Sequence, residues 1–394
     1  MNLNKSINIS ISDIIIFFAA FLLFVFPNSF RGIKLPFLLI IFLFSFVEIK
    51  KINKISILFY LLSIVTTTIY IIKGSFQTKD LNEMVKQVLI VYVFTPLLWI
   101  FISNYCFEKY KIYNIFKTLN VFMILGCLSV YLGIWLFNTG RIDILELIIE
   151  KPNMTFSDGL VEMKLQVYGA LIFFVPAHVQ LYNYYEKKYK YIIVLLFSFI
   201  TAVISGRSAL LLSIFLGILF FMMSKKIIYW LKYLILAIFS FLLVNLILLN
   251  FGVSFSNTFD ELYIKIFEGG GKVRNEQAVA LLNGINENIF GAGHGVGVDY
   301  IRSNKYPWRY EYLPFATIFR VSFLGLLVYA LPFLYTTYKF FSIKNKNCYD
   351  NYLMCGYLAM IISTFTNPYL ESFEFNVFYV FPFIYFLKRD KIFI

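Results

Sequence analysis

Charged side chains are scarce in this chain of 394 residues, because Asp, Glu, Lys and Arg together make up only 14% of it. Soluble domains average about 25% charged and about 45–50% apolar residues. Here 60% of the residues are hydrophobic, and they include 47 Phe and 29 Tyr. This composition excludes an ordinary soluble domain and indicates a protein that lies mainly in lipid.

Histidine and cysteine are also rare, with two His and four Cys in the whole chain. The four cysteines lie within or beside apolar runs, and their spacing indicates neither a disulfide framework nor a metal site. The long polar segments contain no pair of carboxylates with metal-binding spacing. We therefore expect chemistry that uses no metal and no cofactor. The cysteines are Cys106, Cys127, Cys348 and Cys355.

Apolar windows of about 17–25 residues, the length that a helix needs to cross a hydrocarbon core of about 30 Å, recur along the chain. The first of them is not followed by a small-residue cleavage pattern, so we interpret it as a span and not as a signal peptide. We predict an all-α polytopic integral membrane protein of about 12 transmembrane helices, forming a single transmembrane domain over residues 1–394. The windows begin near Ile14, Ile33, Ile55, Val88, Ile112, Leu165, Tyr191, Ser208, Ile227, Leu313, Tyr352 and Phe373.

The net charge of +13 has two explanations: the protein binds an acidic partner, or its basic residues lie in loops on one side of the membrane. A nucleic acid would be one such partner, but basic residues of polytopic membrane proteins gather in cytoplasmic loops. If the N-terminus is cytoplasmic, every lysine-rich connection between windows faces the cytoplasm. We therefore predict cytoplasmic N- and C-termini, membrane lipids as partners and no nucleic-acid partner. The basic connections are 50–54, 109–117, 187–190, 225–226, 339–346 and 388–391.

Two long polar segments, about 138–164 and about 251–312, then face outward. The second contains "EGGGKVRNEQAVALLNGINENIFGAGHGVGVDY", in which Arg274 and Gln277 share one face of a predicted helix. The alternating glycines around His294 match neither a dinucleotide fingerprint nor a phosphate loop. We interpret them as a tight connection, with a ligand-binding loop as the alternative. Nucleotides are not available outside the membrane, so chemistry there would require an activated, lipid-linked donor.

Four short motifs follow one another in the second half of the chain. "ISGRSALLLS" places Arg207 between two apolar windows, and the helix that carries Arg274 and Gln277 leads into a G-x-G-x-G turn. Glu311 then opens a span that contains "LG", and "TNPYLES" places Asn367 before a proline near the C-terminus. In this order the motifs resemble the superfamily of Wzy-type O-antigen polymerases and O-antigen ligases. The resemblance covers about residue 165 to the C-terminus.

The resemblance implies a GT-C-like fold with a large, partly helical periplasmic loop, in the inner membrane of a bacterium with two membranes. It implies transfer of a growing glycan from undecaprenyl diphosphate to a new lipid-linked repeat unit, with a chain-length regulator as a further partner. The ligases of this superfamily tend to carry histidine where this chain has Glu311. This departure favours an O-antigen polymerase over a ligase that acts on lipid A-core. A lipid-linked oligosaccharide flippase or transporter is the alternative from another class.

Displacement of a diphosphate builds negative charge on the leaving group, and preorganised cations stabilise that charge. Arginine is suited to the task because its planar fork binds two oxygens and stays charged. We predict that Arg207 and Arg274 hold the diphosphate. Ser208 would cap the next helix, whose N-terminal amides favour an anion. The alternative for Arg207 is an interfacial side chain that reaches to the lipid headgroups.

Glu311 is the candidate general base for the acceptor hydroxyl, or else it forms an ion pair with Arg309 or Arg320. Arg320, inside the same predicted span, is either a third anion contact or the partner of Glu371 or Glu374. The other candidates for substrate binding are polar residues of the same motifs, although an exposed loop histidine is the alternative for one of them. They are Gln277, His294, Asn367 and Glu371.

Overall fold

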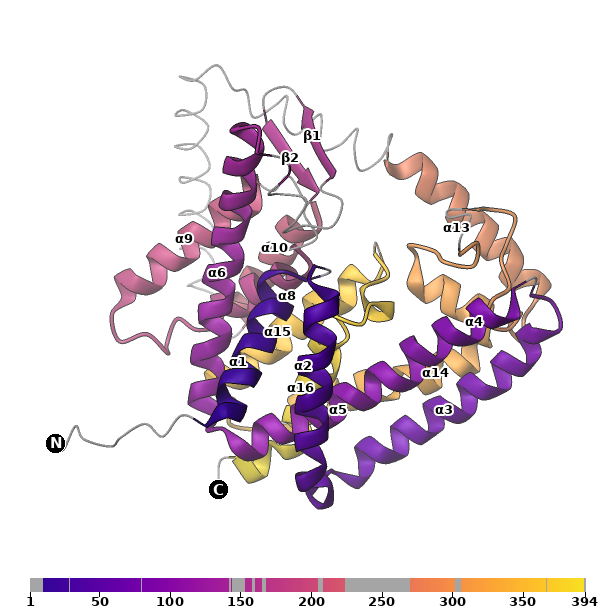
Figure 1. Cartoon of the computed structure of the whole chain (residues 1–394), viewed down its shortest axis with the longest axis horizontal. Helices are drawn as coiled ribbons and strands as arrows, with labels where there is room; N and C mark the ends of the chain where they lie inside the picture. Colours follow the sequence, from indigo (N-terminus) through magenta and orange to yellow (C-terminus); the bar gives the residue numbers. More distant parts are fainter. Residues whose placement is uncertain are drawn as a thin grey trace.

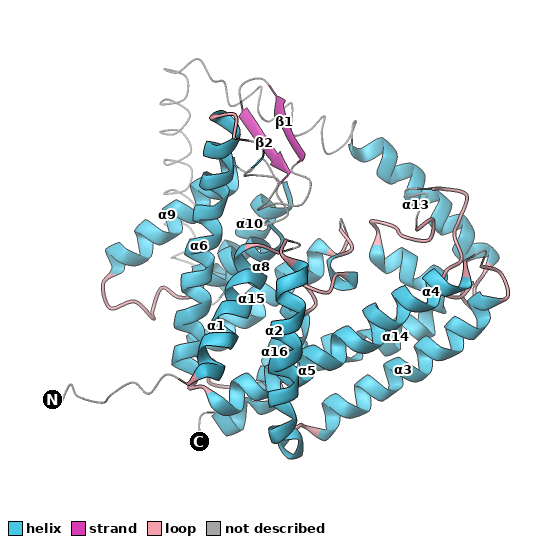
Figure 2. Cartoon of the chain, in the orientation of Figure 1, coloured by secondary structure: helices cyan, strands magenta, loops and turns pink. Residues whose placement is uncertain are grey.

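The computed structural model describes residues 10–27, 29–78, 80–141, 143, 153–157, 160–164, 168–204, 208–223, 270–301, 306–365 and 367–392. Helices make up most of this part of the chain (Figure 2). A π-helical stretch, η2 (Leu89–Phe94), joins α4 to α5 into one long helical segment, and η1 (Phe46–Lys51) and η4 (Tyr369–Glu371) are short 3-10 turns. The helices are α1 (Ile11–Val25), α2 (Arg31–Ser45), α3 (Lys54–Ser75), α4 (Leu81–Val88), α5 (Thr95–Lys109), α6 (Ile112–Asn138), α8 (Tyr168–Val179), α9 (Lys188–Ile204), α10 (Ser208–Met223), α13 (Gly270–Glu287), α14 (Leu313–Ser342), α15 (Cys348–Ser363) and α16 (Val377–Ile392).

Four helical segments of the described chain are long and apolar enough to cross a membrane: Lys54–Ser75, Leu81–Lys109, Ile112–Leu136 and Leu313–Ser342. At a rise of about 1.5 Å per residue, even the shortest reaches about 33 Å, which matches a hydrocarbon core of about 30 Å. The chain therefore has the helices of a membrane protein, as its composition predicts. The window that begins near residue 227 lies outside the described residues. Shorter apolar helices are Ile11–Val25, Gly32–Ser45, Gly169–Val179 and Ala209–Met223.

The first long polar segment contains a β-hairpin that the sequence pattern does not predict. Strands β1 (Asn153–Ser157) and β2 (Leu160–Lys164) pair antiparallel, with Thr155 opposite Glu162 (Figure 1). The hairpin lies near the end of α6 that is at the top of Figure 1. Apart from this hairpin, the regular structure of the described residues is helical, in keeping with the predicted class.

Helix α8 lies at the centre of the bundle, and all of its residues from Ala170 to Val179 are buried. Glycines on its neighbours allow the close approach. A side chain at Gly356 of α15 would meet Phe173, and one at Gly217 of α10 would meet Pro176, each within 3 Å. Helices pack closely in lipid where small residues face the contact. The core of the bundle is therefore built around α8, between α10 and α15.

Four of the six basic connections have residues at one end of the bundle. The start of α1 and the ends of α5 and α16 meet there, at the lower left of Figure 1. Ion pairs join these ends: Lys109 with Asp13, Lys51 and Lys388 with Glu108, and Arg389 with Asp350 at the start of α15. Residues of the predicted basic connections 50–54, 109–117, 339–346 and 388–391 thus lie at one end of the described bundle, whereas 225–226 lies outside the described residues.

Candidate functional site

Helix α14 is interrupted about one third of the way along its length, at Ser322. Ser322 has φ 61° and ψ 177°, so the backbone there leaves the helical conformation. A positive φ is costly for a residue that has a Cβ, and it persists only where the surroundings fix it. The hydroxyl of Ser322 lies 2.9 Å from that of Tyr70 on α3, and Ser322 is 5% exposed. The break interrupts the helical hydrogen bonds and frees backbone carbonyls just before Ser322.

The glycine-rich turn after α13 satisfies those carbonyls. The N–H of Ala292 donates to the carbonyl of Phe319 at 2.7 Å, and the N–H of Gly293 donates to that of Arg320 at 2.9 Å. Gly293 has φ 103°, a conformation that a side chain would oppose. Irregular backbone at membrane depth is tolerated only where protein or water satisfies it. The alternating glycines therefore form a tight connection that docks onto a broken helix, the first of the two interpretations given above.

Arg320 lies on the turn before the break and is 3% exposed. Its guanidinium forms an ion pair with Glu371 of η4 and donates to the hydroxyl of Tyr92 at 3.3 Å and to the carbonyl of Trp308 at 2.7 Å. The Tyr92 hydroxyl donates in turn to Glu371 at 2.6 Å. Burial alone would raise the pKa of Glu371, but the charge of Arg320 and the hydrogen bond from Tyr92 lower it. The site therefore holds a charged carboxylate against a charged guanidinium.

The pairing of Arg320 with Glu371 is one of the two roles that the sequence leaves open for this arginine. The positive charge is compensated inside the protein, and the two terminal nitrogens are occupied by protein acceptors. The Nε atom of Arg320 is buried and has no hydrogen-bond partner among the described residues. Arg320 is thus placed to hold α14 against η4.

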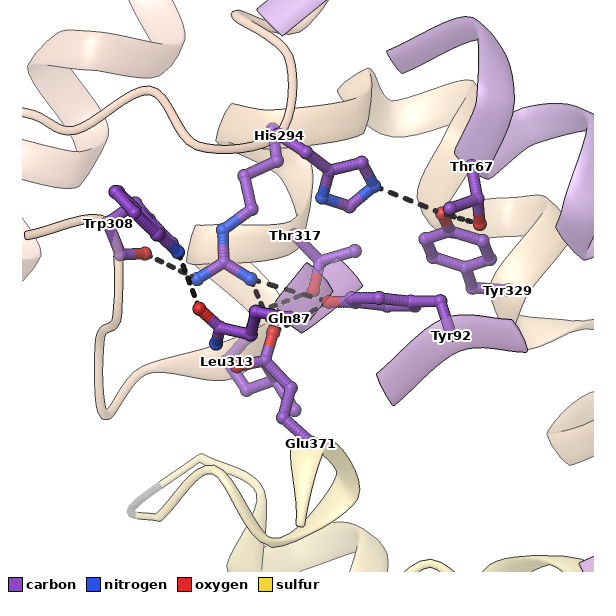
Figure 3. Close-up of polar contacts among 10 residues, drawn as sticks. Thr67, Gln87, Tyr92, His294, Trp308, Leu313, Thr317, Tyr329 and Glu371 are labelled. Carbon is purple, nitrogen blue, oxygen red and sulfur yellow. Dashed lines mark hydrogen bonds and ion pairs between the residues drawn. The ribbon is translucent and has the colours of Figure 1, made fainter. Parts of the chain in front are cut away.

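His294 lies beside this ion pair and is 1% exposed, so it is not an exposed loop histidine. Its ring centroid is 5.0 Å from that of Tyr92, and its Nε2 lies 3.4 Å from the hydroxyl of Tyr329 (Figure 3). That hydroxyl is 2.8 Å from the hydroxyl of Thr67 on α3. Burial, together with the charge of Arg320, lowers the pKa of His294 to about 3. The imidazole is therefore neutral near pH 7.

Gln277 of α13 joins two of the sequence motifs directly. Its side-chain oxygen accepts a hydrogen bond from the N–H of Glu311 at 2.8 Å and one from the N–H of Tyr312 at 3.2 Å. Gln277 is 2% exposed, whereas Glu311 is half-buried. Around this contact, Leu281 packs in one apolar cluster with Phe319. The candidate base is therefore fixed, through its backbone, to the helix that carries Arg274.

Five of the predicted site residues are thus brought to one region around the start of α14: Gln277, His294, Glu311, Arg320 and Glu371. Asn367 is half-buried in the turn after α15, where its N–H donates to the carbonyl of Ser363 at 3.0 Å. Arg207 lies outside the described residues. Ser208 begins α10 and Arg274 lies within α13, but their side chains lie outside the described part of the chain.

Several residues that contact Arg320, His294 or Trp308 could not be identified as site residues from the sequence. Tyr92 lies in the apolar run "VLIVYVF" and Tyr329 in "LGLLVYALP", where tyrosine resembles any core or lipid-facing aromatic residue. Gln87 accepts a hydrogen bond from the indole N–H of Trp308 at 2.8 Å and so fixes the residue whose carbonyl receives Arg320. Gln87 belongs to the polar stretch "LNEMVKQ" that precedes the apolar run, where a glutamine gives no indication of this contact.

Comparisons of the chain with family models, with curated proteins and with solved structures give no match. Within the described residues, no group of three or more His, Cys, Asp or Glu side chains gathers to hold a metal ion. The fold and the site define a class, namely a helical membrane protein with a break in one long apolar helix. A buried ion pair joins the turn before this break to η4.

Proposed function

We propose that this protein is a glycosyltransferase that polymerises O-antigen or a related surface polysaccharide in the inner membrane. A growing glycan is transferred from undecaprenyl diphosphate to a new lipid-linked repeat unit at the periplasmic face. The proposal includes about 12 spans, a GT-C-like fold and cytoplasmic termini. The gathering of basic connections at one end of the bundle supports this orientation. The partners are the lipid-linked repeat units, membrane lipids and a chain-length regulator.

The hydrogen bonds between Gln277 and the backbone of Glu311 and Tyr312 carry the proposal. They join two motifs that lie 34 positions apart in the sequence. Arg274 is three residues before Gln277 and therefore on the same face of α13. The helix with a candidate diphosphate-binding cation is thus fastened to the segment with the candidate base, and this link supports the proposal.

In the proposed reaction Glu311 takes the proton of the acceptor hydroxyl as its oxygen attacks the anomeric carbon of the donor. The bond from that carbon to the diphosphate breaks, and the lipid diphosphate leaves with the electron pair. Arg274 and Arg207 stabilise the charge that develops on the leaving group. Arg320 and Glu371 compensate each other, so the proposal assigns them to positioning α14. Gln277 and His294 are buried with contacts inside the protein and are assigned to positioning as well, so the proposed substrate contacts are Ser208 and Asn367.

A second function is favoured by the break in α14. Transporters place their substrate sites at discontinuous helices, and ionisable residues inside spans commonly mark transport pathways. Ser322 and the ion pair between Arg320 and Glu371 fit that description. A flippase for lipid-linked oligosaccharides is therefore the second candidate, and the ligase is the alternative within the transferase class.

Deletion of the gene followed by gel analysis of lipopolysaccharide separates the three functions. Loss of a polymerase leaves core with a single repeat unit, and loss of a ligase leaves bare core. Loss of a flippase also leaves bare core, but lipid-linked single repeats then accumulate on the cytoplasmic side. Bare core in the deletion strain would therefore overturn the proposal.

Point variants returned to the deletion strain test the assigned residues. Arg207→Ala and Arg274→Ala should each give the single-repeat phenotype at normal expression. The matched control is Glu276→Gln, which changes an exposed charge on the same helix as Arg274 and should keep the long chains. Long chains in either arginine variant would contradict its role. Full activity of Glu311→Gln would exclude Glu311 as the base.

A further inference from the structure

A cavity of about 370 Å³ lies at the basic end of the bundle, away from the site at the start of α14. It is lined by the last turn of α14, the connection to α15 and the end of α16. Ser342, Lys344 and Asn345 line it and are exposed, so the cavity opens to the surface. Phe386 of α16 is buried and contributes an apolar part of the lining.

The charges around this cavity are unevenly compensated. Arg389 lines it but is held by Asp350 at 3.0 Å and donates to the carbonyl of Asn345 at 2.9 Å. Lys339 and Lys344 also line the cavity and form no ion pair among the described residues. Asp390 is the one acidic residue of the lining. Two lysines against one aspartate leave the lining with a single excess positive charge, which matches the single negative charge of a phosphodiester.

An apolar stripe runs along α14 toward the rim of the cavity. Leu334, Tyr338 and Phe341 are 57%, 66% and 67% exposed, and their spacing of four and three residues places them on one face of the helix. Tyr338 precedes Ser342, a cavity residue, by four positions, so stripe and cavity are adjacent on the helix. This helix is long and apolar enough to span a membrane, and such a face is suited to acyl chains.

We propose that this cavity binds the headgroup of an anionic phospholipid. Lys339 and Lys344 hold the phosphodiester, while the acyl chains lie along Leu334, Tyr338 and Phe341. Basic pockets between transmembrane helices are suited to anionic headgroups. A free phosphate ion would use the lysines and leave the apolar stripe unoccupied, so a lipid is the occupant that uses both features. This inference is independent of the proposed glycosyl transfer.

The test uses the full chain purified in detergent, with native mass spectrometry for binding and thermal unfolding for stabilisation. Three probes are added separately: phosphatidylglycerol, phosphatidylethanolamine and inorganic phosphate. We expect phosphatidylglycerol to bind and raise the Tm, while the zwitterionic lipid and inorganic phosphate leave the Tm unchanged. Lys339→Gln combined with Lys344→Gln should weaken the binding of phosphatidylglycerol about thirtyfold.

Two further variants keep the test informative if the double lysine variant folds poorly. Asp390→Asn removes the opposing charge and should strengthen the binding of phosphatidylglycerol. Lys187→Gln with Lys190→Gln removes two exposed lysines elsewhere on the chain and should leave the binding unchanged. Unchanged affinity in Asp390→Asn, equal loss in the control, or equal stabilisation by either of the other two probes would each overturn the proposal.

Discussion

Arg320 and Glu371 form an ion pair across 51 positions of the chain, and each side chain is 4% exposed. Removing two charges from water costs several kcal/mol per ion, and only good geometry with further hydrogen bonds repays that cost. Tyr92 and the carbonyl of Trp308 supply those hydrogen bonds here. The pair therefore fastens η4 to the turn of α14 that precedes the break.

Removal of either partner should destabilise the protein strongly. Arg320→Met leaves a buried carboxylate without its cation, and Glu371→Gln leaves a buried guanidinium without its anion. Each should lower the free energy of unfolding by about 3–5 kcal/mol. The double variant Arg320→Met with Glu371→Gln should lose less than the sum of the two single losses, because it leaves no uncompensated charge. Unfolding of the purified protein in detergent measures these differences.

The exposed pair between Lys86 and Glu83, separated by 4.0 Å, provides the control. Lys86→Ala should change the free energy of unfolding by less than about 1 kcal/mol, since solvent screens exposed pairs. Strictly additive losses in the Arg320 and Glu371 double variant would contradict a direct coupling between them.

A second prediction concerns the link between α13 and Glu311. Gln277→Leu keeps the volume of the side chain but leaves the N–H groups of Glu311 and Tyr312 without their acceptor. An unsatisfied buried donor costs about 1–3 kcal/mol. We expect a lower Tm and, if the proposed function holds, loss of long glycan chains. Gln277→Glu retains an acceptor oxygen and should retain more of the stability than the leucine variant does.

The broad architecture follows from the sequence because lipid imposes a simple rule. Backbone polar groups must be satisfied within each span, so a long apolar run predicts a helix. The described windows accordingly contain helices, as over Lys54–Ser75 and Leu313–Ser342. The hairpin of β1 and β2 is not predicted, because a polar segment between spans carries no comparable constraint.

The break in α14 shows why the site is harder to predict. Ser322 lies in "RVSFLG", where no proline or glycine marks the position of the break itself. The groups that make the break stable come from elsewhere: Tyr70 on α3, and Ala292 and Gly293 after α13. These contacts are tertiary, so local pattern indicates the glycine turn but not the helix onto which it docks. The burial of His294 results from the same docking and likewise cannot be predicted from the sequence.

The docking of the glycine turn can be tested by adding single methyl groups. A Cβ at Gly74 of α3 would collide with the carbonyl oxygen of His294, and one at Gly293 would collide with the backbone of Gly74. Overpacking of this kind costs about 1–3 kcal/mol. Gly74→Ala and Gly293→Ala should therefore lower the Tm and make the segment after α13 more sensitive to protease.

Gly32 offers a matched control for these two substitutions, because a Cβ there would meet no atom within 4 Å. Gly32 lies in α2, where alanine is the better helix former, so Gly32→Ala should leave the Tm unchanged or raise it. Equal Tm values for all three variants would mean that the turn does not depend on its close contact with α3.

Acid should destabilise the protein through His294, whose pKa is lowered from 6.5 to about 3 by burial and by the charge of Arg320. Below pH 6.5 the unfolded chain binds a proton that the folded protein does not bind until about pH 3. The folded state therefore loses stability as the pH falls through this window, by up to about 1.4 kcal/mol per pH unit. Between pH 7.5 and pH 5 the loss should reach about 2 kcal/mol.

The variant His294→Gln isolates this contribution, because glutamine does not titrate. Its unfolding free energy should depend less steeply on pH between 7.5 and 5 than that of the unaltered protein. Glu371 also has a lowered pKa and acts in the same direction, but its effect begins mainly where the unfolded chain gains a proton, near pH 4.5 and below this window. Unfolding curves measured at half-unit steps of pH compare the two proteins. An equal slope in both would show that the imidazole of His294 is not held neutral by the fold.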